Sequence, residues 1–140
     1  MKYVDASALL RLLFAEPGPV VPLAPGDRVA SSHVVEVEAF RAIDRARLRG
    51  DLTDSETAIK RSELSRILAM LDLVPVDLQV IDRAKSSFSV NVRALDALHV
   101  ATAEILAAEA EGEVVEFWTH DGRQGTAALS RGLTVRGIAG

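Results

Sequence analysis

The stretch YVDASALL, residues 3–10, joins the end of a short apolar strand to the start of an apolar helix through one carboxylate, Asp5. In open sheets built from alternating strands and helices, ligands bind outside the carboxyl ends of the strands. The helices that start at this edge also bring the positive ends of their dipoles to it. The position of Asp5 therefore predicts a ligand site at this edge of a sheet.

The same alternation of strand and helix continues along the rest of the chain. We predict strands near residues 2–5, 28–31, 73–76, 115–119 and 133–136, and helices over 6–15, 33–49, 54–71, 78–88, 94–111 and 122–131. Residues 16–27 contain four of the five prolines and are predicted to form an irregular loop. The alternation predicts an α/β fold, a three-layer α/β/α sandwich around a mainly parallel sheet of four to five strands.

Composition indicates one domain over residues 1–140, with 49% apolar residues, a net charge of -4 and no cysteine. The absence of cysteine excludes disulfides and thiolate metal ligands, and it favours a reducing cytoplasm. No apolar run approaches the roughly 18 residues that a membrane span needs, so we expect no membrane association. The acidic charge confines any nucleic-acid contact to a local basic surface.

Three further acids are predicted to lie near strand ends or in the first turns of helices: Glu38, Asp96 and Asp121. Each also has a structural explanation, because a first-turn aspartate interacts with the helix dipole and an aspartate after a strand often caps a turn. Four acids at equivalent places in the fold are harder to explain in this way. Carboxylate oxygens are the ligands that Mg²⁺ and Mn²⁺ prefer, and the set predicts a metal site.

In the helix predicted over 33–49, Glu38 shares one stripe with Arg41 and Arg45. The functional interpretation makes Glu38 a metal ligand and the two arginines phosphate-binding residues. The wheel alone favours the alternative, a solvated face held by ion pairs one turn apart. Glu36 is predicted to point into the apolar arc of this helix, where a buried acid is a second candidate ligand.

Two histidines lie beside the acids. We predict that His99 is packed or hydrogen-bonded and stays outside the metal site, while His120 is a weaker candidate than its neighbour Asp121. The helix around His99 is predicted to bury the face that carries Leu95, Leu98, Thr102 and Ile105.

Four blocks resemble the PIN-domain ribonucleases that act as toxins in VapBC-type toxin-antitoxin pairs: YVDASALL (3–10), SSHVVEVEAFRA (31–42), RALDALHVATA (93–103) and WTHDGRQGTAALSRGLTV (118–135). The third block is the most specific. The resemblance implies that Asp5, Glu38, Asp96 and Asp121 are the metal-binding and catalytic acids. It selects Glu38 over Glu36, because an Arg-Ala pair follows it, and it places the hydroxyls of Ser7 and Thr119 beside the site.

The function implied by this resemblance is a Mg²⁺- or Mn²⁺-dependent endoribonuclease toxin of a type II system, which hydrolyses RNA phosphodiester bonds with metal-activated water. It implies a cytoplasmic protein whose partners are RNA and a cognate VapB-like antitoxin that inserts an arginine near the acids. One alternative is a catalytically inactive PIN-like binding or regulatory module that acts with the antitoxin. Another is a phosphatase or haloacid-dehalogenase-like hydrolase, which needs a second aspartate at the position that Ser7 occupies.

The resemblance also implies that a helical hairpin around residues 54–90 serves dimerisation and antitoxin contact. The apolar residues of this segment exceed what one face of a small sheet requires, and exposed apolar patches mark interfaces. We therefore predict a homodimer formed through Ile59, Leu64, Ile67, Leu68, Leu71, Ile81 and Phe88.

Overall fold

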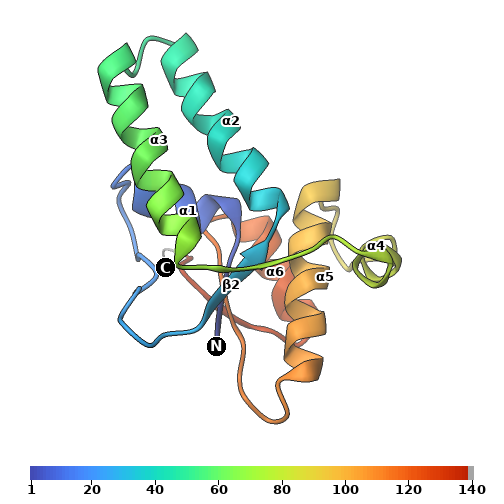
Figure 1. The fold of residues 1–140 in the computed structure, drawn as a ribbon. Helices are drawn as coiled ribbons and strands as arrows, with labels where there is room; N and C mark the ends of the chain where they lie inside the picture. The colour runs from blue at the N-terminus through green and yellow to red at the C-terminus, as the bar shows by residue number, and fades with distance from the viewer. Residues whose placement is uncertain (139–140) are drawn as a thin grey trace.

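The computed structural model describes residues 1–138 and contains every predicted strand and helix (Figure 1). No helix in this range has both the length and the apolar character that crossing a membrane requires. In chain order, the elements are β1 (Lys2–Val4), α1 (Ala6–Leu13), β2 (Val29–Ser32), α2 (Val34–Leu48), α3 (Asp54–Ala69), β3 (Asp72–Val74), α4 (Leu78–Ala84), α5 (Ala94–Glu109), β4 (Glu116–Trp118), α6 (Gly122–Ser130) and β5 (Thr134–Arg136).

Helix α4 ends four residues earlier than the predicted 78–88. The hydroxyl of Ser86 donates to the carbonyl oxygen of Arg83 at 2.7 Å. Serine side chains compete in this way with the helical hydrogen bonds of the backbone, and they favour helix ends.

The five strands form one sheet in the order β3-β2-β1-β4-β5, and every pair is parallel. This confirms the predicted α/β class. From β1 the chain first builds the sheet outward through β2 and β3, and it then returns to the other side of β1 for β4 and β5. The order of strands thus reverses between β1 and β4, which is where ligands bind in open parallel sheets.

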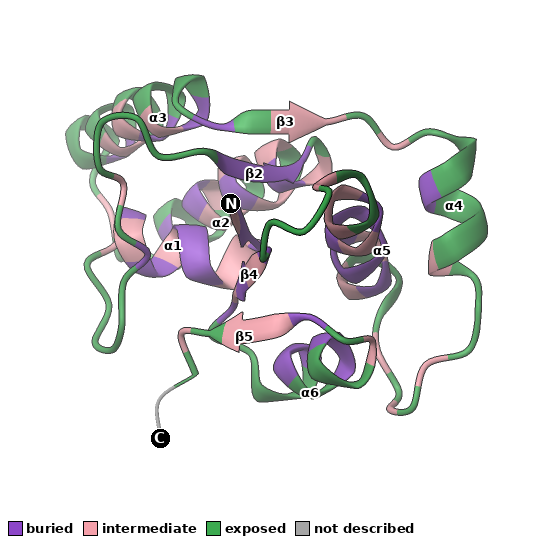
Figure 2. Ribbon diagram, turned by 90° about the horizontal axis from the view of Figure 1, so that it is seen from below, coloured by how far each residue is buried: buried purple, intermediate pink, exposed green. Residues whose placement is uncertain are grey.

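Helices cover both faces of the sheet, as Figure 2 shows: α1, α2 and α3 lie on one face, and α5 and α6 on the other. Consecutive strand residues point to opposite faces. Val4 accordingly packs with the first set of helices, whereas Tyr3 packs with the second set and stacks on Phe117. The result is the predicted three-layer sandwich, with one core on each side of the sheet.

The predicted helical hairpin over residues 54–90 is wrong. Helix α3 instead pairs with α2, and the two project together from the sheet (Figure 1). Helix α4 packs on α5, and β3 separates it from α3. Periodicity shows that a helix has an apolar face, but it does not show which neighbour covers that face.

Most of the apolar residues that suggested a dimer belong to the core of the single chain. Leu64, Leu68 and Leu71 are buried, and Ile67 and Phe88 pack against the two main cores. Ile59 and Ile81 remain exposed, at 54% and 40%. Of the seven residues predicted to form the dimer interface, only Ile59 and Ile81 are therefore exposed enough to contact a second copy.

Helix α5 is buried on more sides than the predicted face, because the sheet covers one side and α4 another. Val100, Ala101 and Ala103 are fully buried, and Thr102 is buried as predicted. Leu95, predicted to lie in the core, is 44% exposed. It lies in the first turn of α5, at the edge of the sheet where the acids gather.

The proline-rich segment 16–27 forms the predicted irregular loop, and a buried cation holds it in place. The Nη1 atom of Arg11 donates to the carbonyl oxygens of Pro19 at 2.6 Å and Gly137 at 2.8 Å. Its Nε donates to Nδ1 of His120 at 3.1 Å. Arg11 thereby ties α1, the loop and the residues after β5 together.

Candidate active site

Asp5 lies at the carboxyl end of β1 and is 1% exposed. Its Oδ1 accepts hydrogen bonds from the backbone nitrogen of Ala8 at 2.9 Å and from the hydroxyl of Ser7 at 2.8 Å. Its Oδ2 accepts from the hydroxyl of Thr119. A carboxylate has about four acceptor positions. Asp5 caps helix α1 and still keeps one position, on Oδ2, for a cation.

The hydroxyls of Ser7 and Thr119 connect Asp5 to the loop after β4. They lie 3.2 Å apart. Ser7 accepts from the backbone nitrogen of His120 at 2.7 Å, and Thr119 accepts from that of Asp121 at 3.0 Å. These contacts bring the ends of β1 and β4 together at the reversal point of the sheet.

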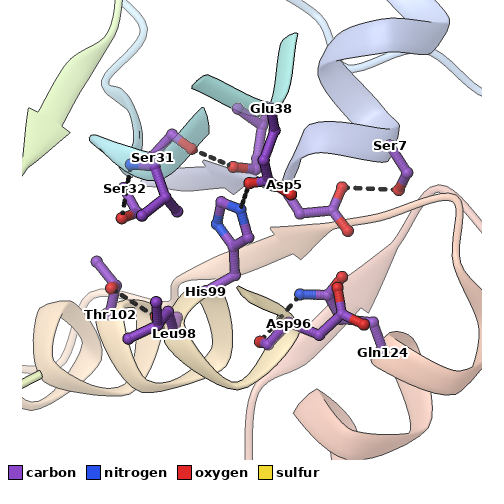
Figure 3. A network of polar contacts seen from close by, with 12 residues as sticks. Asp5, Ser7, Ser31, Ser32, Glu38, Asp96, Leu98, His99, Thr102 and Gln124 are labelled. Atoms are coloured by element: carbon purple, nitrogen blue, oxygen red, sulfur yellow. Dashed lines mark hydrogen bonds and ion pairs between the residues drawn. The ribbon is translucent and has the colours of Figure 1, made fainter. Parts of the chain in front are cut away.

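Glu38 reaches the same region from α2, where it meets His99 of α5 (Figure 3). Nε2 of His99 lies 2.6 Å from Oε1 of Glu38, and Nδ1 lies 2.6 Å from the hydroxyl of Tyr3. An ionised carboxylate only accepts hydrogen bonds, so Nε2 carries a proton, and in a neutral ring Nδ1 then accepts from Tyr3. His99 is buried and hydrogen-bonded, as predicted, and Oε2 of Glu38 has no hydrogen-bond partner in residues 1–138.

Asp96 lies in the first turn of α5, half-buried, and its carboxylate makes no hydrogen bond or ion pair within residues 1–138. Its backbone oxygen accepts from Nε2 of Gln124 at 3.2 Å, which fixes α5 against α6. Burial raises the pKa of Asp96, and the negative charges of Asp121 and Asp5 raise it further. Asp96 is thus a carboxyl group without a hydrogen-bond or ion-pair partner in residues 1–138, and other acids lie near it.

Asp121 caps helix α6 and is exposed. Its Oδ1 accepts from the backbone nitrogens of Arg123 at 2.9 Å and Gln124 at 3.3 Å. The predicted structural explanation for this aspartate is therefore correct. It does not exclude a ligand role, because the cap uses only one of the two oxygens.

The four acids lie near one edge of the sheet, and Asp96 and Asp121 line the same cavity. Asp5, Glu38 and Asp121 all act to raise the pKa of Asp96. Burial raises the pKa of Asp5 although His99 and three hydrogen bonds oppose the shift. Glu38, Asp96 and Asp121 each keep at least one oxygen with no hydrogen-bond partner in residues 1–138, whereas Oδ2 of Asp5 accepts one hydrogen bond and keeps one acceptor position. Carboxylate oxygens of this kind are ligands that suit Mg²⁺ or Mn²⁺.

The four carboxylates do not converge on one point. Over residues 1–138, no three His, Asp or Glu side chains are grouped as the ligands of one metal ion. The cause is visible in the contacts, since Glu38 is turned toward His99 and Asp121 toward its own helix. The donor chemistry fits a hard divalent cation.

Glu36, the second candidate on α2, is not buried in the apolar arc, and that prediction is wrong. Its side chain is 42% exposed and pairs with Nδ1 of His33 at 3.2 Å. The buried arc of α2 consists of Val35, Ala39, Ile43 and Ala46. One residue is a rotation of 100° on a helix, so Glu36 lies just beside the arc and reaches solvent.

The two arginines that follow Glu38 on the stripe differ. Arg41 pairs with Asp44 at 3.2 Å, which is the predicted solvated alternative. Arg45 is exposed and has no acidic partner in residues 1–138. Both line a cavity of about 680 Å³ beside Glu38.

This combination of a parallel sheet and four acids at its reversal point has a match among known families. Residues 2–125 match the PIN domain. The chain belongs to the PIN-domain family.

Two bacterial ribonucleases are similar in sequence to this chain along most of its length. Ribonuclease VapC46 of Mycobacterium tuberculosis (strain ATCC 25618 / H37Rv) is 32% identical over 136 residues, which are 95% of this chain and 94% of that protein. Ribonuclease VapC47 of Mycobacterium tuberculosis (strain CDC 1551 / Oshkosh) is 30% identical over 131 residues, which are 88% of this chain and 86% of that protein. Within the PIN-domain family, the chain is thus similar to VapC ribonucleases.

Proposed function

We propose that this protein is an endoribonuclease toxin of a VapBC-type toxin-antitoxin system that hydrolyses RNA phosphodiester bonds with a divalent metal. The observation that carries the proposal is the meeting of Asp5, Asp96 and Asp121 with Glu38 at the reversal point of the sheet. The likeness to two proteins named as ribonucleases supports the same activity.

Mg²⁺ or Mn²⁺ is the proposed cofactor, held by Asp5, Glu38, Asp96 and Asp121. When bound, such an ion activates water for attack on phosphorus and stabilises charge on the leaving oxygen. The chain itself orients the acids. Ser7 and Thr119 fix the carboxylate of Asp5 by donating to its two oxygens.

His99 serves the same purpose for Glu38. It donates to one carboxylate oxygen, and Tyr3 holds its other nitrogen. Contacts of this kind set the direction of a metal-binding carboxylate and maintain it while the substrate binds.

The proposed partners are RNA and a VapB-like antitoxin, both in the cytoplasm. We propose that the antitoxin places an arginine near the four acids and so replaces the positive charge of the metal.

A homodimer is also part of the proposal, supported by the exposed side chains of Ile59, Leu78 and Ile81. Arg41 and Arg45, which line the cavity beside Glu38, are proposed to bind RNA phosphate. Arg41 must first exchange its contact with Asp44.

The test is cleavage of RNA by the purified protein with Mn²⁺ and, in parallel, with a chelator. Cleavage that needs the metal and stops on addition of the cognate antitoxin supports the proposal. Intact RNA under all conditions, together with tight antitoxin binding, would assign the chain to the alternative, an inactive binding module.

A further inference from the structure

The basic side chains of the protein are mostly occupied by acids of its own surface. All sixteen Lys and Arg residues lie within residues 1–138, and eleven of them form an ion pair there. The five without an acidic partner in this range are Arg11, Arg45, Arg66, Arg93 and Arg123. Arg11 is buried and holds the proline-rich loop. Four exposed cations therefore remain for an external anion.

Three of these four line the cavities around the acids. A cavity of about 440 Å³ contains Arg93 and Arg123 together with Asp96 and Asp121. The cavity of about 680 Å³ beside Glu38 contains Arg93 and Arg45. Arg93 lines both cavities. It lies immediately before α5, three residues from Asp96. It therefore connects the cavity that contains Asp96 and Asp121 with the cavity that contains Glu38.

No stabilising contact within residues 1–138 explains why the side chain of Arg93 is an arginine. It caps α5 only through its backbone and makes no side-chain hydrogen bond or ion pair within residues 1–138. It is exposed although two acids line the same cavity. A guanidinium group presents a planar fork of donors that matches the oxygens of a phosphate.

The wider cavity also offers an apolar surface. Val37 is 65% exposed and Leu95 44% exposed, and both lie in its wall. A strand of RNA whose bases are unpaired presents apolar faces as well as phosphates. The cavity of about 680 Å³, with Arg45 and Arg93 as cations and an apolar wall, is complementary to such a strand.

We propose that Arg93 binds the phosphodiester backbone of a single-stranded RNA segment where it crosses the acidic site, with Arg123 and Arg45 holding the phosphates on either side. This inference rests on the proposed function, because it assumes that RNA is the ligand. It adds Arg93 and Arg123 as substrate-binding residues and orders them along one path.

The test compares Arg93→Ala with Arg66→Ala. Arg66 is an ideal control because it is an exposed arginine of α3 without an ion pair in residues 1–138, and it lines none of the cavities described above. Both variants remove one positive charge and change the net charge from -4 to -5. Binding of a short fluorescein-labelled single-stranded RNA is measured by anisotropy over a range of salt concentrations, in chelator so that no RNA is cut.

We expect Arg93→Ala to weaken binding about tenfold, the loss that one charge-assisted contact produces. Its plot of log affinity against log salt should be flatter by about 0.7, the value of one phosphate contact on a single strand. Arg93→Lys should keep the wild-type slope with reduced affinity. Arg123→Ala should resemble Arg93→Ala, and Arg66→Ala should bind like the wild type.

Equal slopes for Arg93→Ala, Arg123→Ala and Arg66→Ala overturn the inference, and so does a wild type whose RNA binding is absent or independent of salt. The activity of the wild type with Mn²⁺ is measured separately. Selective loss of binding in Arg93→Ala with no cleavage by the wild type would support the RNA path and reject the nuclease. Cleavage by the wild type with no effect of Arg93→Ala on binding would do the reverse.

Discussion

Nε2 of His99 and Oε1 of Glu38 lie 2.6 Å apart, although the two residues are 61 positions apart in the chain. The hydroxyl of Tyr3 holds the other nitrogen of His99, so that a chain of hydrogen bonds runs from the centre of the sheet to the acidic site. Tyr3 is fully buried, and burial raises its pKa well above the ordinary range of tyrosine, which keeps its hydroxyl protonated. The orientation of Glu38 is thus determined by the core.

His99→Ala should lower RNA cleavage about 10- to 100-fold, because a metal-binding carboxylate loses the partner that orients it. The concentration of Mn²⁺ needed for half-maximal rate should rise as well. Val100→Ala, at the neighbouring buried position of α5, serves as the control, because it shortens an apolar side chain of the core and removes no hydrogen-bonding group. A similar loss of rate in both variants would show that general damage to the core, rather than Glu38, is responsible.

Asp96→Asn should reduce RNA cleavage by about two to three orders of magnitude while the fold survives. Asp96 is the cleanest of the four acids to test, because its carboxylate has no partner in residues 1–138 and an amide of the same shape binds a metal poorly. Asp5→Asn should have the same effect on cleavage, but it also disturbs the hydrogen bonds from Ser7 and Thr119. Asp82→Asn on the exposed side of α4 serves as the control, and rates are measured on one labelled RNA. Wild-type rates for Asp96→Asn would contradict the proposed site.

Divalent metal should raise the melting temperature of the wild type. The mutual repulsion of the acids destabilises the metal-free protein, and an ion that binds only the native state stabilises it by about 2.7 kcal/mol at a hundredfold excess over Kd. Asp96→Asn should melt higher than the wild type in chelator and gain less from Mn²⁺. A wild type without a metal-dependent shift, combined with a lower melting temperature of Asp96→Asn in chelator, would make Asp96 a structural residue.

The pH dependence of these melts follows from the raised pKa values of Asp5 and Asp96. Between the unfolded pKa, about 3.9, and the higher folded pKa, the native state binds more protons than the unfolded state. The contribution of these groups is therefore full below about pH 4 and is lost as the pH rises through the folded values. The advantage of Asp96→Asn over the wild type in chelator should grow with pH over this interval.

Gly18→Ala should destabilise the protein more than Gly26→Ala. Both glycines have a positive φ, of 116° and 86°, which strains any other residue by about 1–3 kcal/mol. Only at Gly18 would the added Cβ lie 2.9 Å from Cζ of Arg11, whose buried guanidinium is held by hydrogen bonds to the carbonyl oxygens of Pro19 and Gly137. At Gly26 nothing lies within 4 Å. Equal losses of melting temperature in the two variants would mean that the loop yields and Arg11 does not clamp it.

The proposed homodimer should depend on the exposed apolar side chain of Leu78, which is 80% exposed at the start of α4. Leu78→Asp should shift the molecular mass in light scattering from dimer to monomer at micromolar concentration, because a buried charge without a partner opposes association. Leu129→Asp on α6, where the leucine is 64% exposed, is the matched control. A monomeric wild type would exclude the dimer under these conditions.

By itself the sequence determined the properties that depend on near neighbours in the chain. The alternation of strand and helix predicted the parallel sandwich, four prolines predicted the loop, and strand ends placed Asp5 and Asp121 at one edge of the sheet. These succeeded because helical and strand periods, proline geometry and strand ends are local properties. Glu38 and Asp96 were candidates from their places near helix starts, and the resemblance to PIN domains selected Glu38 over Glu36.

Only the tertiary structure decided which surfaces meet. It paired α3 with α2, placed Leu95 at the surface and turned Glu38 toward His99. It also left Arg93, which lines two cavities, without an ion-pair partner in residues 1–138. Periodicity in the sequence indicates which face of a helix or strand is apolar. Which segment covers that face depends on the packing of segments far apart in the chain.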